Sequence, residues 1–312
     1  MNKLLILAAD AEKYIALIKK ARLPQLEIMH ASDTGSVRRL ISGCNIVLGD
    51  PPLVSDVLAK ADKLEWVQSS WAGVDQLCRA GLRRDYILTG AKGIFGPLIS
   101  EYVMTYLFAL ERRLFTMRSN QLERYWKPYS YRPAKDITLG IIGLGSIGRH
   151  LALSAQHFGL RVTGLNRLGK PCDEVEEVYP GDKLADFLRE PDYVVLTLPA
   201  TPETEHMVHA DVLAMMKPST VLMNVGRGNS VNEDDLIHAL QEGTIGGAVL
   251  DVFEDEPLSR ESPLWQMPNV YVTPHNAAAS FPEDISRIFI ENYHRYLQSE
   301  PLLHEVNFEL GY

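Results

Sequence analysis

One run of six residues has the spacing of a phosphate-binding turn. Gly143-Leu144-Gly145-Ser146-Ile147-Gly148 follows an apolar run, Thr138 to Ile142, and opens a stretch with the pattern of a helix. The first glycine permits a tight turn, the second lets a pyrophosphate approach the backbone, and the third lets the helix pack on the strand. N–H groups at the helix start, with Ser146 and Ile147, then face the phosphates. The run predicts a dinucleotide-binding site, with an unliganded glycine-rich turn as the alternative.

The end of the next predicted strand indicates which dinucleotide would bind. That strand, Arg161 to Leu165, leads into Asn166-Arg167, about 20 residues after the glycine run. An NAD site needs Asp or Glu at this point to bond the ribose hydroxyls. Asn166 carries no negative charge and Arg167 can pair with a 2′-phosphate, so these residues favour NADP over NAD. The alternative is that Arg167 points to solvent and that NAD binds.

Two series of strands and helices position these residues. In each series, short apolar runs alternate with amphipathic stretches, which predicts parallel sheets with helical crossovers. Loops at the strand ends of such sheets face a ligand. The predicted strands are Leu4 to Ala8, Ile46 to Gly49 and Leu64 to Gln68 in the first series, and Ile137 to Ile142, Arg161 to Leu165, Tyr193 to Leu198, Val221 to Val225, Ala248 to Val252 and Val270 to Thr273 in the second.

A long helical segment separates the two series. The stretch from Leu98 to Arg118 contains no Gly or Pro, and a helix of that length spans about 30 Å, enough to link two domains. The segment Gln121 to Ala134 that follows is rich in aromatic residues, Trp126 among them. It either packs as a loop on a neighbouring element or is buried against a second subunit.

Composition excludes several classes of protein. A chain of 312 residues with 46% hydrophobic and 23% charged residues is typical of a globular protein of two domains. The net charge of −9 argues against nucleic acid or an anionic membrane as the main partner. No apolar stretch approaches the ~20 residues of a membrane span, and the first strand is too short for a secretory leader. Three cysteines without a Cys-x-x-Cys pair predict a reduced, cytoplasmic protein with no metal site.

Four ordered motifs resemble those of one enzyme family. They are Gly140 to Gly148, Asn224 to Gly228, Leu250 to Pro257 and Thr273-Pro274-His275. Together they resemble the D-isomer-specific 2-hydroxyacid dehydrogenases, most of all the glyoxylate/hydroxypyruvate reductases. The resemblance covers nearly the whole chain. It implies an α/β protein in which a Rossmann-type doubly wound parallel sheet domain, residues 99–281, is inserted into a flavodoxin-like substrate domain of residues 1–98 and 282–312.

The resemblance also implies three catalytic residues. The Arg227 guanidinium would clamp a carboxylate and the neighbouring carbonyl oxygen through paired hydrogen bonds. His275 would donate a proton to that carbonyl oxygen as hydride reaches the carbon. Glu256 would hydrogen-bond His275 and keep it protonated. The alternatives are that Arg227 caps a helix end and that Glu256 belongs to an acidic surface loop.

Further binding residues are implied in the same way. Trp71-Ala72-Gly73 resembles part of the family's substrate turn, in which N–H groups of Ala72 and Gly73 bind the substrate carboxylate. Trp71 would either wall a small pocket or simply pack. The remaining residues implied to line the cofactor are Leu198, Pro199, Thr204, Val225, Gly226, Arg227, Asp251 and His275.

The expected function is therefore reduction of a small 2-oxo acid, glyoxylate or hydroxypyruvate, by NADPH in a homodimer. One alternative is an NAD-dependent D-2-hydroxyacid dehydrogenase that acts on another 2-oxo acid. A second alternative is a dinucleotide-sensing interaction protein. The joint presence of Arg227, Glu256 and His275 favours an enzyme.

Overall fold

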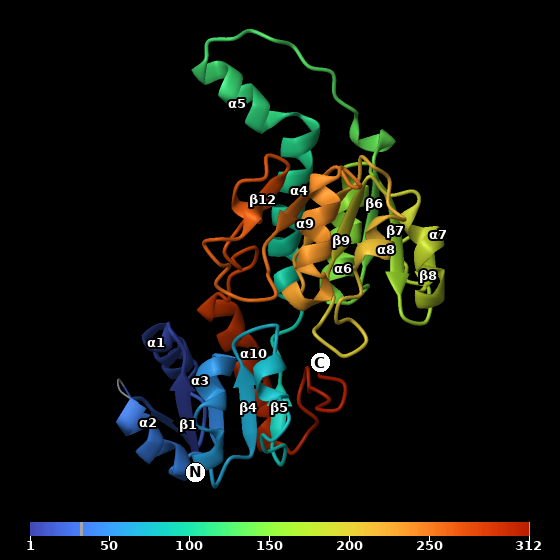
Figure 1. Cartoon of the computed structure of the whole chain (residues 1–312). Helices are drawn as coiled ribbons and strands as arrows, with labels where there is room; N and C mark the ends of the chain where they lie inside the picture. The colour runs from blue at the N-terminus through green and yellow to red at the C-terminus, as the bar shows by residue number, and fades with distance from the viewer. Residues whose placement is uncertain (32–33, 312) are drawn as a thin grey trace. The chain divides into compact units, whose positions relative to one another are not determined.

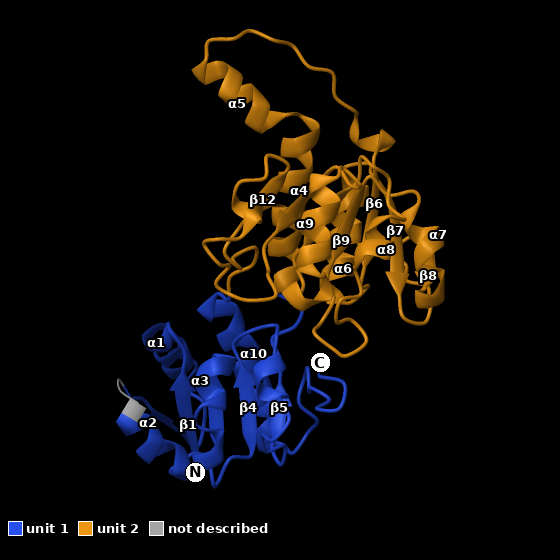
Figure 2. Cartoon of the chain, in the orientation of Figure 1, with its two compact units in different colours: residues 1–94, 280–312 blue, residues 95–279 orange. Residues whose placement is uncertain are grey.

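The chain consists of two compact units (Figure 2). A computed structural model describes residues 1–31 and 34–311. Unit 1 comprises Met1–Ile94 and Ser280–Tyr312, and unit 2 comprises Phe95–Ala279. Unit 2 is thus an insertion in unit 1, and the boundaries expected from the sequence fall at 98/99 and 281/282.

Unit 1 contains a five-stranded parallel sheet in the order β2-β1-β3-β4-β5. This is the strand order of flavodoxin-like folds. The edge strands β2 and β5 were not anticipated, because they are short and lack the continuous apolar run of a strand buried on both faces. The elements of unit 1 are β1 (Asn2–Leu7), α1 (Ala11–Ala21), β2 (Leu26–Met29), α2 (Thr34–Leu40), β3 (Ile46–Gly49), α3 (Pro51–Ser55), β4 (Trp66–Ser69), β5 (Ile87–Thr89) and α10 (Pro282–Leu297).

Unit 2 contains a seven-stranded parallel sheet in the order β12-β11-β10-β9-β6-β7-β8 (Figure 1). Counted from β6 as the first strand, this is the Rossmann order extended by one strand. Edge strand β8 was again not anticipated. The elements are α4 (Phe95–Glu111), α5 (Leu114–Leu122), β6 (Thr138–Ile142), α6 (Ser146–His157), β7 (Arg161–Asn166), β8 (Glu177–Pro180), α7 (Leu184–Leu188), β9 (Tyr193–Leu196), α8 (Ala210–Leu213), β10 (Val221–Asn224), α9 (Glu233–Gln241), β11 (Gly247–Leu250) and β12 (Val270–Val272).

Apolar layers cover both faces of the sheet in unit 2. Ile141 of β6 packs in a cluster with residues of α4 and α6, whereas its neighbour Ile142 packs in a second cluster with residues of α7, α8 and α9. Successive strand residues point to opposite faces, so a sheet covered on both sides requires unbroken apolar strands. The burial of both faces explains why the inner strands were recognisable from sequence.

The prediction of one continuous helix from Leu98 to Arg118 is wrong. Helix α4 ends at Glu111, Arg113 adopts a left-handed backbone with φ of 52°, and α5 begins at Leu114. Helix α5 buries none of its residues, and it projects with the following segment, residues 123–133, from the body of unit 2 (Figure 1). We refer to residues 114–133 as the arm.

Two glycines of the turn after β6 differ in how closely they are packed. A Cβ atom at Gly148 would lie 2.1 Å from the carbonyl oxygen of Gly143, whereas a Cβ at Gly145 would have no atom within 4 Å. We therefore expect Gly148→Ala to lower the free energy of unfolding of unit 2 by about 1–3 kcal/mol, as overpacking does. Gly145→Ala, at the open N-cap of α6, is the matched control and should cost less, up to about 1 kcal/mol. Urea titrations followed by circular dichroism measure both, and an equal loss in the two variants would contradict this account.

Candidate active site

The residues predicted to act in unit 2 follow the carboxyl ends of five parallel strands. Gly143 follows β6, Leu198 follows β9, Val225 follows β10, Asp251 follows β11, and His275 lies three residues after β12. In a parallel sheet these ends share one edge. The structure therefore brings this set together at a single edge of the sheet in unit 2.

The glycine run forms a turn that leaves room for a phosphate group. Gly143 has φ of 104°, a conformation that side chains disfavour, and Gly145 is the N-cap of α6. The space beside Gly145 is open, and the first turn of α6 carries no acidic residue. The N–H groups of Ser146 and Ile147 lie in that first turn. This arrangement fits the pyrophosphate of a dinucleotide.

Asn166 shapes the turn at the end of β7. Its Oδ1 accepts hydrogen bonds from the N–H groups of Leu168 (3.2 Å) and Lys170 (3.0 Å), and its Nδ2 donates to the carbonyl oxygen of Lys170 at 2.8 Å. Arg167 is exposed on this turn. The pKa of the nearby Glu203 carboxyl is lowered by hydrogen bonds from its own N–H and from Thr201, with a smaller effect from Arg167. The turn thus presents a cation beside the loop after β9.

Hydrogen bonds within the loop after β9 stabilise its conformation. Thr204 Oγ1 donates to the carbonyl oxygen of Pro199 at 2.7 Å and accepts from the N–H of Thr201 at 2.9 Å. A Cβ at Gly226 would lie 2.7 Å from backbone atoms of Leu198, so this loop and the turn after β10 are in close contact. The backbone continues the sheet pairing one residue further, because the N–H of Val225 bonds the carbonyl oxygen of Leu196 at 3.2 Å.

Asn224 fixes the turn that carries Arg227. It is buried, its Oδ1 accepts from the N–H of Gly226 at 3.1 Å, and its Nδ2 donates to the carbonyl oxygen of Arg227 at 2.9 Å. Ser230 also donates to that carbonyl oxygen, at 2.6 Å. Asn224 opens one of the four motifs named above, but sequence analysis gave it no role of its own. Its position as a polar residue at the end of an apolar strand, directly before Gly-Arg-Gly, is the signal that identifies it.

His275 and Glu256 are directly hydrogen-bonded. His275 Nδ1 lies 2.7 Å from Glu256 Oε2, and the other carboxylate oxygen accepts from the N–H of Phe253 at 3.1 Å. About half of the His275 side chain is exposed. Because Nδ1 is engaged by the carboxylate, Nε2 is the nitrogen available to a substrate.

The electrostatic environment favours the charged form of both groups. The hydrogen bond to Glu256 and the charge of that carboxylate raise the pKa of His275 against the effects of burial and of Arg227. Burial acts to raise the pKa of Glu256, but the hydrogen bond to His275, its charge and that of Arg227 hold it below its ordinary value. His275 and Glu256 thus each favour the charged form of the other, and the Arg227 charge acts on both groups.

Asp251 organises the turn that bears His275. Its buried carboxylate accepts from the Thr273 hydroxyl at 2.6 Å and from the N–H groups of Asn276 and Ala277 at 2.9 and 3.0 Å. Its carbonyl oxygen accepts from the N–H of His275 at 2.8 Å. The side chain is therefore committed to this turn, whereas its expected place beside the nicotinamide stays a prediction.

The predicted substrate turn lies in unit 1, directly after β4. Ser69 Oγ bridges both sides of Trp71, since it donates to its carbonyl oxygen at 3.0 Å and accepts from its N–H at 3.1 Å. Trp71 as a residue is 40% exposed. Across residues 1–31 and 34–311, the N–H groups of Ala72 and Gly73 donate to no acceptor of the chain. They are available to an external acceptor such as a carboxylate.

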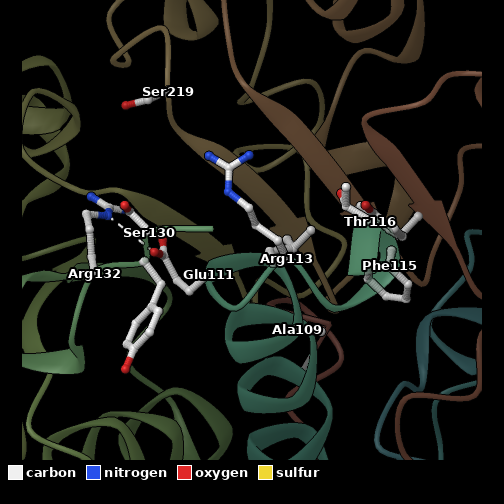
Figure 3. A pocket seen from close by; sticks show the side chains of 11 residues that line it. Ala109, Glu111, Arg113, Phe115, Thr116, Ser130, Arg132 and Ser219 are labelled. Carbon is white, nitrogen blue, oxygen red and sulfur yellow. Dashed lines mark hydrogen bonds and ion pairs between the residues drawn. The ribbon is translucent and has the colours of Figure 1, made fainter. Parts of the chain in front are cut away.

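A cavity of about 540 Å³ lies at the opposite edge of the sheet in unit 2, at the base of the arm (Figure 3). Arg132 spans this base through ion pairs with Glu111 and with Asp192 (2.9 Å). Residues before β6 and β10 line the cavity, so it is separate from the candidate site. The part of the chain that the structure describes contains no cluster of His, Cys, Asp or Glu arranged to hold a metal, and none of its helices could cross a membrane.

Comparison with known proteins identifies the family. Residues 104–277 match the D-isomer specific 2-hydroxyacid dehydrogenase, NAD binding domain family. A glyoxylate reductase from Thermococcus gammatolerans is 37% identical over 72% of this chain and 70% of its own. A solved D-isomer specific 2-hydroxyacid dehydrogenase family protein from Aeromonas salmonicida superposes with a TM-score of 0.94 at 45% identity, over 98% of this chain and 99% of that one.

A second solved structure has a bound dinucleotide. It is an NADPH-dependent glyoxylate/hydroxypyruvate reductase from Sinorhizobium meliloti in complex with NADP and sulfate, with a TM-score of 0.92, 31% identity and full coverage of both chains. The family match and the superposition on these relatives confirm the predictions of fold class and enzyme class. The chain belongs to the D-isomer specific 2-hydroxyacid dehydrogenase family.

Proposed function

We propose that this protein reduces a small 2-oxo acid, glyoxylate or hydroxypyruvate, with NADPH. The observation that carries the proposal is the hydrogen-bonded pair of His275 and Glu256 with the Arg227 charge beside it. A protonated imidazole and a guanidinium are the groups that a 2-oxo acid needs, one for its carbonyl oxygen and one for its carboxylate. The glyoxylate reductase and the NADPH-dependent reductase described above support the choice of substrate and cofactor.

The proposed roles follow from the chemistry of the side chains. NADPH, when bound, supplies a hydride to the carbonyl carbon of the substrate. Arg227 binds the carboxylate and polarises the carbonyl group, and His275 donates the proton from Nε2 to the carbonyl oxygen. Glu256 holds the imidazole by Nδ1 and stabilises its charge before the transfer. In the opposite direction, neutral His275 accepts the proton from the 2-hydroxyl group.

The remaining predicted residues would bind the two ligands. Gly143 to Gly148 would hold the pyrophosphate, and Asn166 and Arg167 the ribose with its 2′-phosphate. Leu198, Pro199, Thr204 and the turn from Val225 would line the nicotinamide side. The N–H groups of Ala72 and Gly73, with Trp71 as a wall, would bind the substrate carboxylate.

We further propose that the protein is a cytoplasmic homodimer. The arm exposes large apolar side chains, with Trp126 96% and Leu122 69% accessible, and surfaces of this kind mark interfaces. Free Cys44, Cys78 and Cys172 are consistent with a reducing compartment. A sedimentation mass equal to one chain would contradict the dimer.

The first test is turnover itself. We expect the purified protein to oxidise NADPH with glyoxylate or hydroxypyruvate faster than with a branched 2-oxo acid, measured as the loss of nicotinamide absorbance. His275→Ala should lower kcat by about 10²- to 10⁴-fold, the usual contribution of general acid catalysis, while NADPH still binds. A parental rate in this variant, or no turnover of any 2-oxo acid by the parent, would reject the proposal.

The second test is the pH profile of reduction. Reduction needs protonated His275, whose pKa is raised chiefly by the hydrogen bond to Glu256, so activity should persist above the ordinary imidazole range and fall as the pH passes that raised value. Glu256→Gln keeps a hydrogen-bond acceptor but removes the charge, so the alkaline limb should move to lower pH. Profiles of kcat/KM for the parent and the variant, measured between about pH 5 and about pH 10, would show the shift of the limb. If the alkaline limb does not move, Glu256 is not the residue that raises the pKa of His275.

The third test is cofactor choice. We expect a higher kcat/KM with NADPH than with NADH, because Arg167 can form a charge-assisted bond to a 2′-phosphate worth about 1.5–3 kcal/mol. The double variant Asn166→Asp, Arg167→Ala restores an acid and removes the cation, so it should reverse the preference. Gly145→Ala is a useful comparison, since a methyl group in the open phosphate space should weaken both cofactors alike. If the parent prefers NADH, the proposed preference for NADPH is wrong and the site is that of an NAD enzyme.

A further inference from the structure

A hydrogen-bonded chain reaches the His275 turn from helix α4. Tyr102 Oη lies 2.7 Å from Thr273 Oγ1, and Thr273 Oγ1 lies 2.6 Å from Asp251 Oδ1. All three residues belong to unit 2, and Asp251 is 2% exposed. The same Asp251 carboxylate accepts the N–H groups of Asn276 and Ala277 on the far side of His275. Tyr102 is thus linked to the turn without touching His275.

The available protons fix the direction of this chain. The Asp251 carboxylate accepts backbone N–H groups and acts only as an acceptor, so Thr273 donates its single hydroxyl proton to it. Thr273 Oγ1 can then only accept from Tyr102. Burial raises the pKa of Tyr102, which therefore keeps the proton that it donates. Donation by Tyr102 polarises the Thr273 hydroxyl and strengthens its bond to the carboxylate.

The conformation of His275 explains why such a chain is needed. His275 has φ of 50°, in the left-handed region that non-glycine residues adopt at an energetic cost. The turn on either side of it is held by one group, the Asp251 carboxylate, through Thr273 before and Asn276 and Ala277 after. If the Asp251 carboxylate were displaced, the segments before and after His275 would both lose hydrogen bonds. The hydrogen bond from His275 to Glu256 would then lengthen.

We propose that Tyr102 and Thr273 are positioning residues that set the geometry of His275 through Asp251. This inference rests on the proposed role of His275 as the proton donor. Other charged groups that act on His275 are Glu256 and Arg227. Asp251 also raises the pKa of His275 through its charge, and the chain from Tyr102 acts on His275 through this carboxylate and the backbone turn that it holds.

The experiment compares isosteric and conservative variants. Thr273→Val removes the hydroxyl at constant shape and Thr273→Ser keeps it, while Tyr102→Phe removes only the first donor. Tyr106→Phe is the matched control, because Tyr106 lies one turn further along α4, packs its ring against Tyr102 with centroids 4.9 Å apart, and within the described residues bonds no partner through its hydroxyl. The readouts are kcat, KM for NADPH, and the titration of the His275 imidazole by NMR, assigned by its loss in His275→Gln.

We expect Thr273→Val to lower kcat about 10- to 100-fold and Tyr102→Phe about 2- to 10-fold, in line with the loss of a charged and a neutral hydrogen bond. KM for NADPH should change little, and Thr273→Ser should recover most of the loss. Adding Tyr102→Phe to Thr273→Val should cost nothing more, because the chain is already broken. The His275 pKa should fall in both single variants, since the bond to Glu256 weakens.

Two outcomes would overturn the inference. One is that Tyr102→Phe and Thr273→Val match Tyr106→Phe in both kcat and titration. The other is a lower kcat with an unchanged His275 titration, which places the loss elsewhere. If the parent reduces no 2-oxo acid, the proposed function fails separately, and the titration still decides whether Tyr102 and Thr273 position His275.

Discussion

The His275–Glu256 hydrogen bond depends on how β11 and β12 are paired. Leu250 pairs with Val272 in parallel register, so Asp251 and Thr273 leave neighbouring strands side by side. This register puts the Asp251 carboxylate next to the turn that must hold His275 at φ of 50°. A histidine held in that conformation costs about 1–3 kcal/mol, which the surrounding hydrogen bonds must offset. The parallel sheet is therefore what permits the strained turn to exist.

The charges of Arg227 and Glu256 have opposite effects on the pKa of His275. Arg227 is suited to bind a carboxylate, but its positive charge lowers the pKa of His275, the residue proposed above as the proton donor. The Glu256 carboxylate restores that pKa by its hydrogen bond and its charge. Arg227 in turn helps to keep Glu256 ionised. Arg227 and Glu256 thus act in opposite directions on the pKa of His275, so we expect replacement of either residue to shift the protonation of the imidazole.

Sequence reasoning recovered the parts of the fold that leave a local signal. The inner strands of unit 2 are apolar throughout because helices cover both faces, and the glycine run is short and contiguous. The edge strands β2, β5 and β8 lack that apolar run. The break between α4 and α5 was missed as well, because arginine favours helices and its residue type does not mark the left-handed turn that the structure shows at Arg113.

In the candidate site, likewise, sequence analysis located the residues that lie in local motifs but not the contacts between residues far apart in the sequence. The motifs around Arg227, Glu256 and His275 are local, and they located these residues. The bond partners of the His275 turn are not local, since Tyr102 lies on α4, far from Asp251 in sequence, and only the completed sheet brings them together. Residue type alone could not show that Asp251 is occupied by backbone N–H groups. The structure shows that this carboxylate accepts N–H groups of the turn, and its expected place along the cofactor stays a prediction.

The backbone conformation of the turn after β7 and the charge on that turn depend on different atoms. Asn166 uses one oxygen to accept two N–H groups and one amide hydrogen to reach Lys170. An aspartate in its place would keep both accepted bonds and lose only the donated one, so the turn itself would survive. What would change is the charge at the proposed ribose position and the field around Arg167. If the ribose binds at this turn as proposed, the choice between the two dinucleotides would depend on electrostatics there and not on the backbone, and a change of one atom type at Asn166 would alter the preference without refolding the site.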